Sequence, residues 1–230
     1  MRISNSVLQK IALLIVLLFQ VSGAIGILFS PYKEWFVQNT TFNLVLMALL
    51  LIITQKQKNA SFFGFVFASY FIGFLVEWIG IHTGALFGSY EYGKVLGLKY
   101  GNVPLLIGVN WFIIIYCTGV VTSKLYDKMN AKFKDVQANI KPVLQFVSIV
   151  VDGALLATFF DFIIEPVAVK LGFWKWLHGT IPFYNYVCWF AVSALLLTIF
   201  RLLPFDKNNR LAVHLFIVQV LFFLLLRVNL

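Results

Sequence analysis

Charged side chains are scarce in this chain, and their scarcity excludes an ordinary soluble domain. They account for 12% of the residues, against about 25% in soluble globular proteins, whereas 61% of the residues are hydrophobic. The longest polar stretch runs only from residue 124 to residue 141, which leaves no room for a separate soluble domain. We therefore expect residues 1–230 to form one all-α transmembrane domain, integral to the cell membrane.

Cysteine, histidine and clustered aspartate are also rare, and each shortage removes a class of function. The two cysteines, Cys117 and Cys188, both lie in apolar segments, where small buried core residues are expected rather than a disulfide or metal framework. A membrane prenyltransferase needs Asp-rich clusters that bind magnesium diphosphate, and the chain has none. The last apolar run has no lysine for a retinal Schiff base, and its single histidine, His214, lacks the partner that haem ligation requires. We expect neither a metal nor a cofactor.

Runs of about 20 apolar residues predict a polytopic bundle of about seven membrane-spanning helices. The runs cover residues 7–29, 40–54, 60–80, 102–123, 142–163, 184–203 and 211–228, of which the second is short. The first run is too long for a signal peptide and no cleavage site follows it, so we expect it to be retained.

The lysine and arginine residues predict the orientation of the bundle, because cytoplasmic loops carry more of them. With the N-terminus inside and the C-terminus outside, twelve fall on the inner side and six on the outer side. The inner set is Arg2, Lys10, Lys56, Lys58, Lys124, Lys128, Lys132, Lys134, Lys141, Arg201, Lys207 and Arg210. This topology, with anionic membrane lipid, accounts for the net charge of +9 without a nucleic-acid partner.

Acidic residues are few, and four of the nine lie within predicted spans or close to their outer ends. They are Glu77, Asp152, Asp161 and Glu165. Ionisable groups at such depth are costly and usually face a cavity or a partner. Asp161 and Glu165 are four residues apart in FFDFIIEP, so they share one helix face, and we expect Pro166 to end that helix. Asp152 is nine residues before Asp161, which places it on the opposite face and outside a shared pocket.

Two outer segments follow these acids, at residues 77–111 and 161–190, and both combine glycine and proline with tyrosine and tryptophan. Aromatic belts at membrane interfaces explain scattered tryptophan and tyrosine, but not the gathering of glycines and acids on one side. Because Glu77, Asp161 and Glu165 lie at the outer ends of their spans, we expect them to meet in one pocket toward the outer leaflet.

The first of these segments contains the pattern E-x-x-G-x-x-T-G-x-x-F-G-x-Y-x-Y, and the second contains D-x-x-x-[DE]-P. The matching residues are Glu77, Gly80, Thr83, Gly84, Phe87, Gly88, Tyr90 and Tyr92, then Trp111, and then Asp161, Glu165, Pro166, Gly172, Trp174, Trp176, Pro182, Asn185 and Trp189. Over this region the chain resembles the carotenoid biosynthesis hydratase family of integral membrane proteins, of the γ-carotene 1′-hydratase and bisanhydrobacterioruberin hydratase type. Relatives usually carry Asp at the position of Glu165 and often Gly at that of Cys188.

The resemblance implies an enzyme that adds water to the terminal isopropylidene double bond of a carotenoid, giving a tertiary alcohol without a cofactor. Such hydration needs an acid, a place for a tertiary cation and a supply of water. Burial and a neighbouring carboxyl group favour the protonated acid. We expect Asp161 to be the proton donor, Glu165 to activate water and Glu77 to be the third catalytic carboxyl group.

Polar and aromatic residues of the same two segments are candidates for substrate binding. They are Tyr90, Tyr92, Trp111, Trp174, Trp176, Asn185 and Trp189. Aromatic faces stabilise a cation by about 0.5–2 kcal/mol each, and Asn185 is expected to hold the water. A dry, aromatic-lined channel should open sideways into the lipid, with Phe-rich residues 62–74 either lining it or facing lipid.

One alternative stays open on the sequence alone. A non-catalytic membrane carrier or transporter for carotenoid or lipid would use the same carboxyl groups as a proton relay. In either case the expected partners are a carotenoid drawn from the bilayer and membrane lipid, with contact to other enzymes of the carotenoid pathway.

Overall fold

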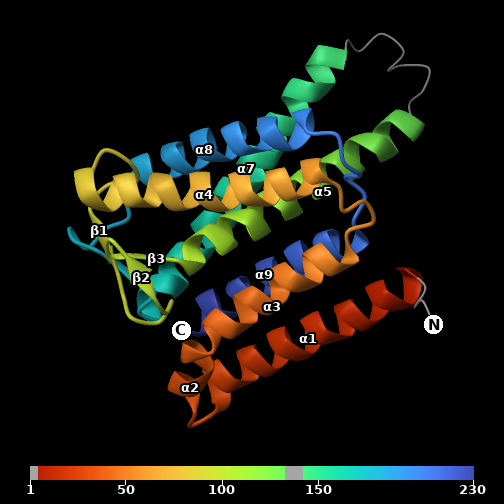
Figure 1. Cartoon of the computed structure of the whole chain (residues 1–230). Coiled ribbons are helices and arrows are strands. Elements are labelled where there is room, and N and C mark those ends of the chain that lie inside the picture. The colour runs from red at the N-terminus through yellow and green to blue at the C-terminus, as the bar shows by residue number, and fades with distance from the viewer. Residues whose placement is uncertain (1–4, 133–141) are drawn as a thin grey trace.

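The computed structural model describes residues 5–132 and 142–230, which form a bundle of long helices with a small β structure at one end (Figure 1). The helices are α1 (Asn5–Phe29), α2 (Lys33–Gln38), α3 (Thr40–Thr54), α4 (Ala60–Thr83), α5 (Leu106–Lys132), α7 (Pro142–Lys170), α8 (Phe183–Leu202) and α9 (Arg210–Asn229). The strands are β1 (Tyr90–Tyr92), β2 (Lys99–Tyr100), β3 (Val103–Pro104) and β4 (Trp174–Trp176).

Six of the described helices are long and apolar enough to cross a membrane, namely α1, α4, α5, α7, α8 and α9. The run at 40–54, already short in the sequence, forms the 15-residue helix α3. The all-α, polytopic membrane fold is therefore confirmed. The N-in, C-out orientation stays a prediction.

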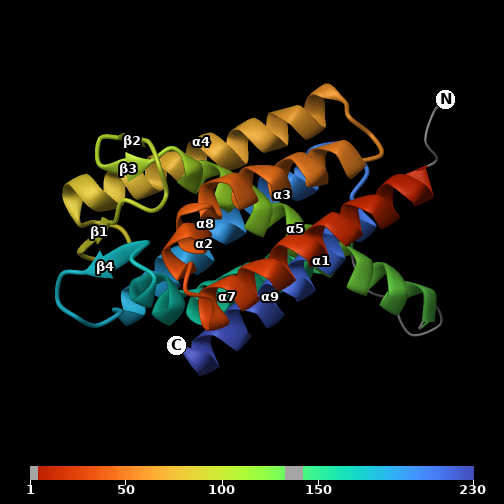
Figure 2. The same cartoon turned by 90° about the horizontal axis from the view of Figure 1, so that it is seen from below.

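Helix α5 is the centre of the bundle. It contacts α3, α4, α7, α8 and α9, and 83% of its most apolar 18-residue window is buried inside the protein. In contrast, only about a third of the corresponding windows of α1 and α9 is buried, as expected for helices that face lipid. Figure 2 shows α1 and α9 lying side by side along one flank. A helix that is apolar all round belongs in the interior, which agrees with the place of α5.

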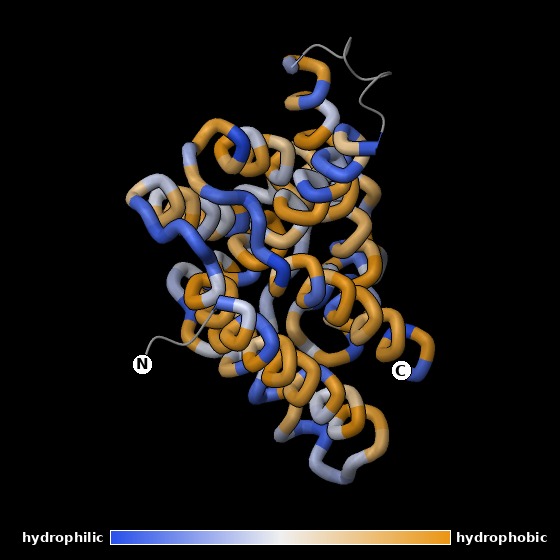
Figure 3. Tube along the Cα trace, turned by 90° about the vertical axis from the view of Figure 1, so that its right-hand side faces the viewer, coloured by the Kyte–Doolittle hydropathy of each residue, from blue (hydrophilic) through white to orange (hydrophobic). Residues whose placement is uncertain are grey.

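Seen from the end that carries the N-terminus, the helices are mostly hydrophobic and many of the hydrophilic residues lie in the segments that connect them (Figure 3). The loop at 55–59 and the start of α9 carry Lys56, Lys58 and Arg210, near the N-terminal end of α1. The strands and the end of α9 lie at the opposite end. Of the basic residues that predict the orientation, Arg2, Lys134 and Lys141 fall outside the described residues.

The expectation that Pro166 ends its helix was wrong, because α7 continues to Lys170 with Pro166 inside it. Proline has no backbone N–H, so the carbonyl oxygen of Phe162, one turn earlier, loses its usual helical donor. Arg227 of α9 donates from Nη1 to that oxygen over 2.8 Å. The guanidinium group also lies 4.5 Å from the centre of the Phe162 ring. A neighbouring helix thus satisfies the carbonyl group, and the carboxyl groups of α7 are not at a helix terminus.

Candidate active site

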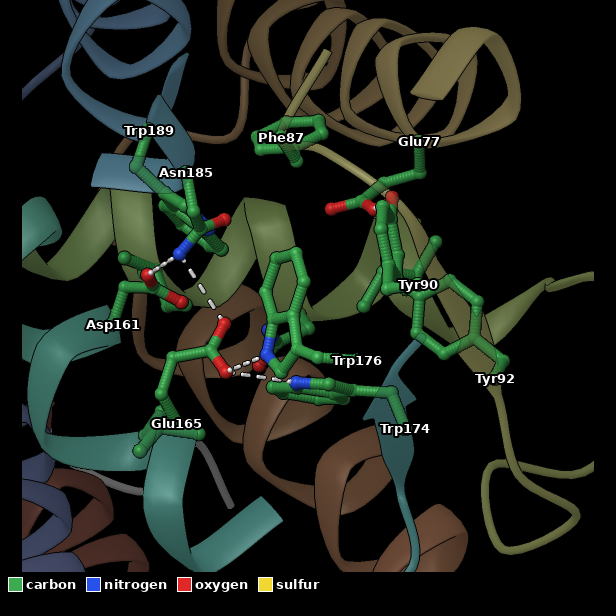
Figure 4. Close-up of a pocket in the computed structure, with 14 residues that line it drawn as sticks. Glu77, Phe87, Tyr90, Tyr92, Asp161, Glu165, Trp174, Trp176, Asn185 and Trp189 are labelled. Carbon is green, nitrogen blue, oxygen red and sulfur yellow. Dashed lines mark hydrogen bonds between the residues drawn. The ribbon is translucent and has the colours of Figure 1, made fainter. Parts of the chain in front are cut away.

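Three carboxyl groups line one cavity at the end of the bundle that carries the strands (Figure 4). Glu77 comes from α4, and Asp161 and Glu165 come from successive turns of α7. Their residues are only 4%, 2% and 2% exposed. The cavity offers about 30 Å³ to the centres of water molecules, which is room for one or two waters. The structure therefore brings together the three acids that the sequence singled out.

All seven of the residues expected to bind substrate are close to these acids. Tyr90, Tyr92, Trp174, Trp176, Asn185 and Trp189 line the cavity, whereas Trp111 is fully buried beside it. Phe87 and Asn110 also line the cavity, although only Phe87 belongs to the sequence motif and neither was expected in the site. Asp152 lies elsewhere, where its Oδ2 accepts a hydrogen bond of 2.8 Å from the Tyr126 hydroxyl group.

Glu77 accepts hydrogen bonds at both of its carboxyl oxygens. The hydroxyl groups of Tyr90 and Tyr92 donate to Oε2 over 2.5 Å and 2.7 Å. Trp111 donates from Nε1 to Oε1 over 3.0 Å. Three donors surround one carboxyl group, which is the environment that stabilises a carboxylate.

Glu165 is held in a similar way from the other side of the cavity. Trp174 and Trp176 donate from their indole nitrogens to Oε2, over 3.0 Å and 2.9 Å. Asn185 of α8 donates from Nδ2 to Oε1 over 3.3 Å. Both oxygens of Glu165 therefore have donors, and the residue joins α7 to β4 and α8.

Asp161 has a different environment from the two glutamates. The same Asn185 amide donates to its Oδ2 over 2.8 Å, and no other hydrogen bond to the Asp161 side chain occurs among the described residues. Its Oδ1 is left without a protein donor beside a cavity of water size. Asp161 is thus the carboxyl group with the least support for a negative charge and with an oxygen free to react.

The strand pair β1–β4 explains why four aromatic residues point toward the carboxyl groups. The strands are antiparallel, with Tyr90 opposite Trp176 and Tyr92 opposite Trp174. Alternate residues of a strand face opposite sides, so these four share one side. Glu91 and Lys175, which lie between them, form an exposed ion pair of 2.5 Å on the other side.

Glycines make the close approach of the two segments possible. Gly84 caps α4 with a φ of +66°, a left-handed conformation that turns the chain away from the helix and toward β1. The backbone nitrogen of Gly93 donates a hydrogen bond of 2.8 Å to the carbonyl oxygen of Phe173. A Cβ atom at Gly93 would lie 1.9 Å from the carbonyl oxygen of Gly172, so a side chain there would force the segments apart.

A stacked pair of tryptophans supports the site from behind. The rings of Trp111 and Trp189 are parallel within 12°, with centroids 4.0 Å apart. Phe87 packs near both rings and adopts a φ of 64°, which is rare for a bulky residue. Its backbone nitrogen donates to Cys188 Sγ over 3.3 Å. Cys117 and Cys188 are both buried and free, as expected.

The two tyrosines of β1 are fixed as hydrogen-bond donors. Burial, followed by the negative charge of Glu77, raises the pKa of Tyr90 and Tyr92 well above the ordinary value of 10.0. Both hydroxyl groups therefore keep their protons and continue to donate to Glu77 over the whole physiological range.

Further cavities extend from the carboxyl groups toward the flank of the bundle. The next one shares Ile107, Asn110, Ile164 and Trp174 with the first, and it offers about 70 Å³ to water centres. A third, of about 630 Å³, lies between α1, α2, α3 and α9 and shares Gln20 and Asn43 with the second. Residues 62–74 line none of these three cavities; Phe62 and Phe65 are buried in the core, whereas Phe67 and Phe71 are exposed.

A family model described as carotenoid biosynthesis protein matches residues 36–230. The chain belongs to this family. The matched region contains every residue that lines the carboxyl cavity. Searches of curated proteins and of solved structures returned no match. The six long apolar helices among the described residues indicate a polytopic integral membrane protein. Within the described residues, no three histidine, cysteine, aspartate or glutamate side chains are grouped to hold a metal ion.

Proposed function

We propose that this protein is a carotenoid hydratase, a cofactor-independent hydro-lyase that adds water to a terminal isopropylidene double bond. The observation that carries the proposal is the difference between the three buried carboxyl groups. Glu77 and Glu165 each accept three hydrogen bonds, whereas Asp161 accepts one and has a free oxygen at a water-sized cavity. One acid and one base around a place for water are the groups that alkene hydration requires.

The proposed reaction begins at Asp161. Its carboxyl proton is transferred to the CH carbon of the double bond, and the electron pair of the double bond forms the new C–H bond. The positive charge is left on the carbon that bears the two methyl groups. Water then forms the C–O bond to this carbon, and its surplus proton passes to the Glu165 carboxylate. Return of that proton to Asp161 through a second water restores both groups, so that H and OH have been added and nothing else consumed.

The aromatic residues of the cavity suit the cationic intermediate. Tryptophan and tyrosine faces attract a cation by about 0.5–2 kcal/mol each, and Trp174, Trp176 and Trp189 line the cavity. Asn185 has a second role in this scheme. Its amide nitrogen holds Asp161 and Glu165 in place, and its side-chain oxygen is left to accept a hydrogen bond from the water.

A carrier or transporter with a proton relay fits this arrangement less well. A relay across the membrane needs ionisable groups at successive depths. Glu77, Asp161 and Glu165 instead surround one cavity at one end of the bundle, and Asp152 is bound to Tyr126 away from them. The arrangement therefore favours local proton transfer to a ligand.

Product analysis in cells tests the proposal. The parent chain should be expressed in cells that make a carotenoid with an acyclic isopropylidene end, beside an Asp161→Asn variant at equal protein level. Extracts with the parent chain should contain the tertiary alcohol, and extracts with the variant should not. Unchanged carotenoid in both extracts would favour the carrier.

The proposal also includes the orientation of the protein, with the carboxyl cavity toward the outer leaflet of the cell membrane. Single cysteines introduced as Glu91→Cys and Lys56→Cys, at exposed positions of opposite ends, provide the test. A thiol reagent that does not cross membranes should label Glu91→Cys in intact cells and label Lys56→Cys only after lysis. The reverse pattern would place the active site on the cytoplasmic side.

A further inference from the structure

The second cavity is lined by four side-chain amides among apolar residues. Gln20, Asn43, Asn110 and Gln219 reach it from four different helices, α1, α3, α5 and α9. Most of the other lining residues are leucine, isoleucine, phenylalanine and tryptophan. Gln20 and Gln219 are only 4% and 5% exposed and lie near the middle of their helices, far from either end of the bundle.

None of these side-chain amides has a hydrogen-bond partner among the residues that the structure describes. Within residues 5–132 and 142–230, no side-chain hydrogen bond involves Gln20, Asn110 or Gln219. The Oδ1 atom of Asn43 is buried and likewise has no partner. A buried amide without a partner is unfavourable by about 1–3 kcal/mol. Gln20 and Gln219 are both buried, so the fold is expected to place them beside a group that binds them.

Among the described residues, the buried amides away from this cavity do have partners, although the hydroxyl groups of Ser69, Ser123 and Ser193 and the Arg201 Nε atom do not. Gln55 donates to the Asp206 carbonyl oxygen over 2.7 Å and accepts from the Tyr116 hydroxyl group over 2.6 Å. Asn209 donates to Thr54 Oγ1 over 3.1 Å. The four amides without partners line the cavity that lies between the carboxyl groups and the third cavity, with which it shares Gln20 and Asn43.

We propose that the cavity between α1, α3, α5 and α9 binds an uncharged oxygen-bearing group of the ligand. An amide offers both a donor and an acceptor, so a hydroxyl group satisfies it in full and an ether or carbonyl oxygen satisfies its N–H. No charged side chain lines the cavity, which disfavours a phosphate or a carboxylate. The inference rests on the proposed function, because it concerns the ligand whose double bond reaches Asp161.

The carboxyl cavity and the amide cavity share part of their lining, so the oxygen-bearing group of the ligand lies close to the double bond that reacts. Asn110 and Trp174 line both the carboxyl cavity and the amide cavity, so the two cavities are neighbours. In the proposed binding mode, a linear isoprenoid with its double bond at Asp161 extends from the first cavity into the second. The preferred substrate is therefore not a pure hydrocarbon in this region. It is a linear isoprenoid that carries an oxygen a few isoprene units from its isopropylidene end. Water bound to the amides is the competing occupant.

Binding of matched probes to the purified protein shows whether the amides bind an oxygen of the ligand or only water. The probes are geraniol, farnesol and geranylgeraniol, and the hydrocarbons in which a methyl group replaces each CH₂OH group. Affinity is measured from the quenching of tryptophan fluorescence and checked by the shift in thermal unfolding. One alcohol of the three should bind about tenfold tighter than its hydrocarbon, since one good hydrogen bond corresponds to about that ratio.

The variant for this test is Gln20→Met combined with Gln219→Met, which keeps the side-chain volume and removes the two buried amides on which the inference rests. The alcohol and its hydrocarbon should bind this variant within about twofold of each other. Because the amides are unpaired, the ligand-free variant should unfold at an equal or higher temperature than the parent. Gln55→Met, which breaks satisfied hydrogen bonds, should lower that temperature and keep the preference for the alcohol.

Equal binding of every alcohol and its hydrocarbon by the parent would overturn the inference in favour of bound water. A preference that survives in the double variant would also overturn it, because Gln20 and Gln219 would then not bind the hydroxyl group. These readouts do not depend on catalysis. An alcohol preference without any hydration of carotenoid would refute the proposed function and retain the site, whereas hydration without the preference would do the opposite.

Discussion

Tyr90 and Trp176 are opposite each other in the β1–β4 pair, and each donates a hydrogen bond to a different carboxyl group. The Tyr90 hydroxyl group lies 2.5 Å from Glu77 Oε2, and Trp176 Nε1 lies 2.9 Å from Glu165 Oε2. The pair therefore connects α4 to α7 through two buried acids. The carboxyl cavity is complete only when two segments more than 80 residues apart in sequence have come together.

Removal of the Trp176 indole donor should lower the free energy of unfolding more than removal of its charged neighbour on the same strand. Trp176→Phe keeps an aromatic ring but removes the hydrogen bond to Glu165, and we expect it to lower the free energy of unfolding by about 1–3 kcal/mol. Lys175→Ala removes only an exposed ion pair, which contributes about 0.2–1 kcal/mol. Thermal unfolding in detergent measures both. A larger loss for Lys175→Ala would contradict the account of the strand pair.

Asp161→Asn should reduce the hydration rate by about 10²- to 10⁴-fold, the usual contribution of a general acid. The amide keeps the size of the side chain, so carotenoid binding should change little. Asp152→Asn on the same helix is the matched control, because Asp152 bonds Tyr126 away from the cavity, and it should retain near-parent rates. Product formation by the purified proteins measures the rates. A near-parent rate for Asp161→Asn would transfer the acid role to Glu77.

The tyrosine pair predicts a dependence of stability on pH. Because the folded pKa of Tyr90 and Tyr92 lies above the ordinary value of 10.0, their stabilisation is fully present below pH 10.0 and is lost as the pH rises toward the folded pKa. The double variant Tyr90→Phe with Tyr92→Phe has no hydroxyl groups at these positions, so it lacks this pH-dependent stabilisation. The gap in unfolding temperature between parent and variant should be constant below pH 10.0 and shrink above it. A gap that widens with pH would refute the assignment.

Pro166 and Arg227 should be energetically coupled. Arg227→Leu leaves the Phe162 carbonyl oxygen without a donor, and we expect a loss of about 0.5–1.5 kcal/mol in the free energy of unfolding. Pro166→Ala restores a backbone N–H, so the same Arg227→Leu change should cost less in that background. Additive losses in this double-mutant cycle would mean that Arg227 does not replace the missing helical donor.

The acids of the site could be identified from the sequence because ionisable residues are rare within apolar spans. Glu77, Asp161 and Glu165 stand out for that reason, and helical spacing correctly separated Asp152 from them. Most of the aromatic candidates also line the cavity, because they lie beside the same acids in the two outer segments.

Other features depend on contacts between distant segments, which sequence spacing does not reveal. The alternation in YEY and WKW, with opposite charges in the centre, is a signal for a strand pair, but three residues are too few to indicate the partner. Helix α7 continues past Pro166, and the carbonyl oxygen that the proline leaves without a helical donor is bound by Arg227, 61 residues later in the chain. Nothing in the sequence distinguishes Gln20 and Gln219. Only the folded protein shows that, among the described residues, no side-chain hydrogen bond involves them.

The source of the added atoms tests the central claim most directly. The purified parent protein should be incubated with an acyclic carotenoid in water labelled with heavy oxygen, and separately in deuterated water, and the product analysed by mass spectrometry. We expect a tertiary alcohol whose oxygen comes from water and whose adjacent carbon carries one solvent-derived hydrogen, with no product from Asp161→Asn. A product whose oxygen comes from dioxygen, or binding of the carotenoid without any conversion, would contradict it.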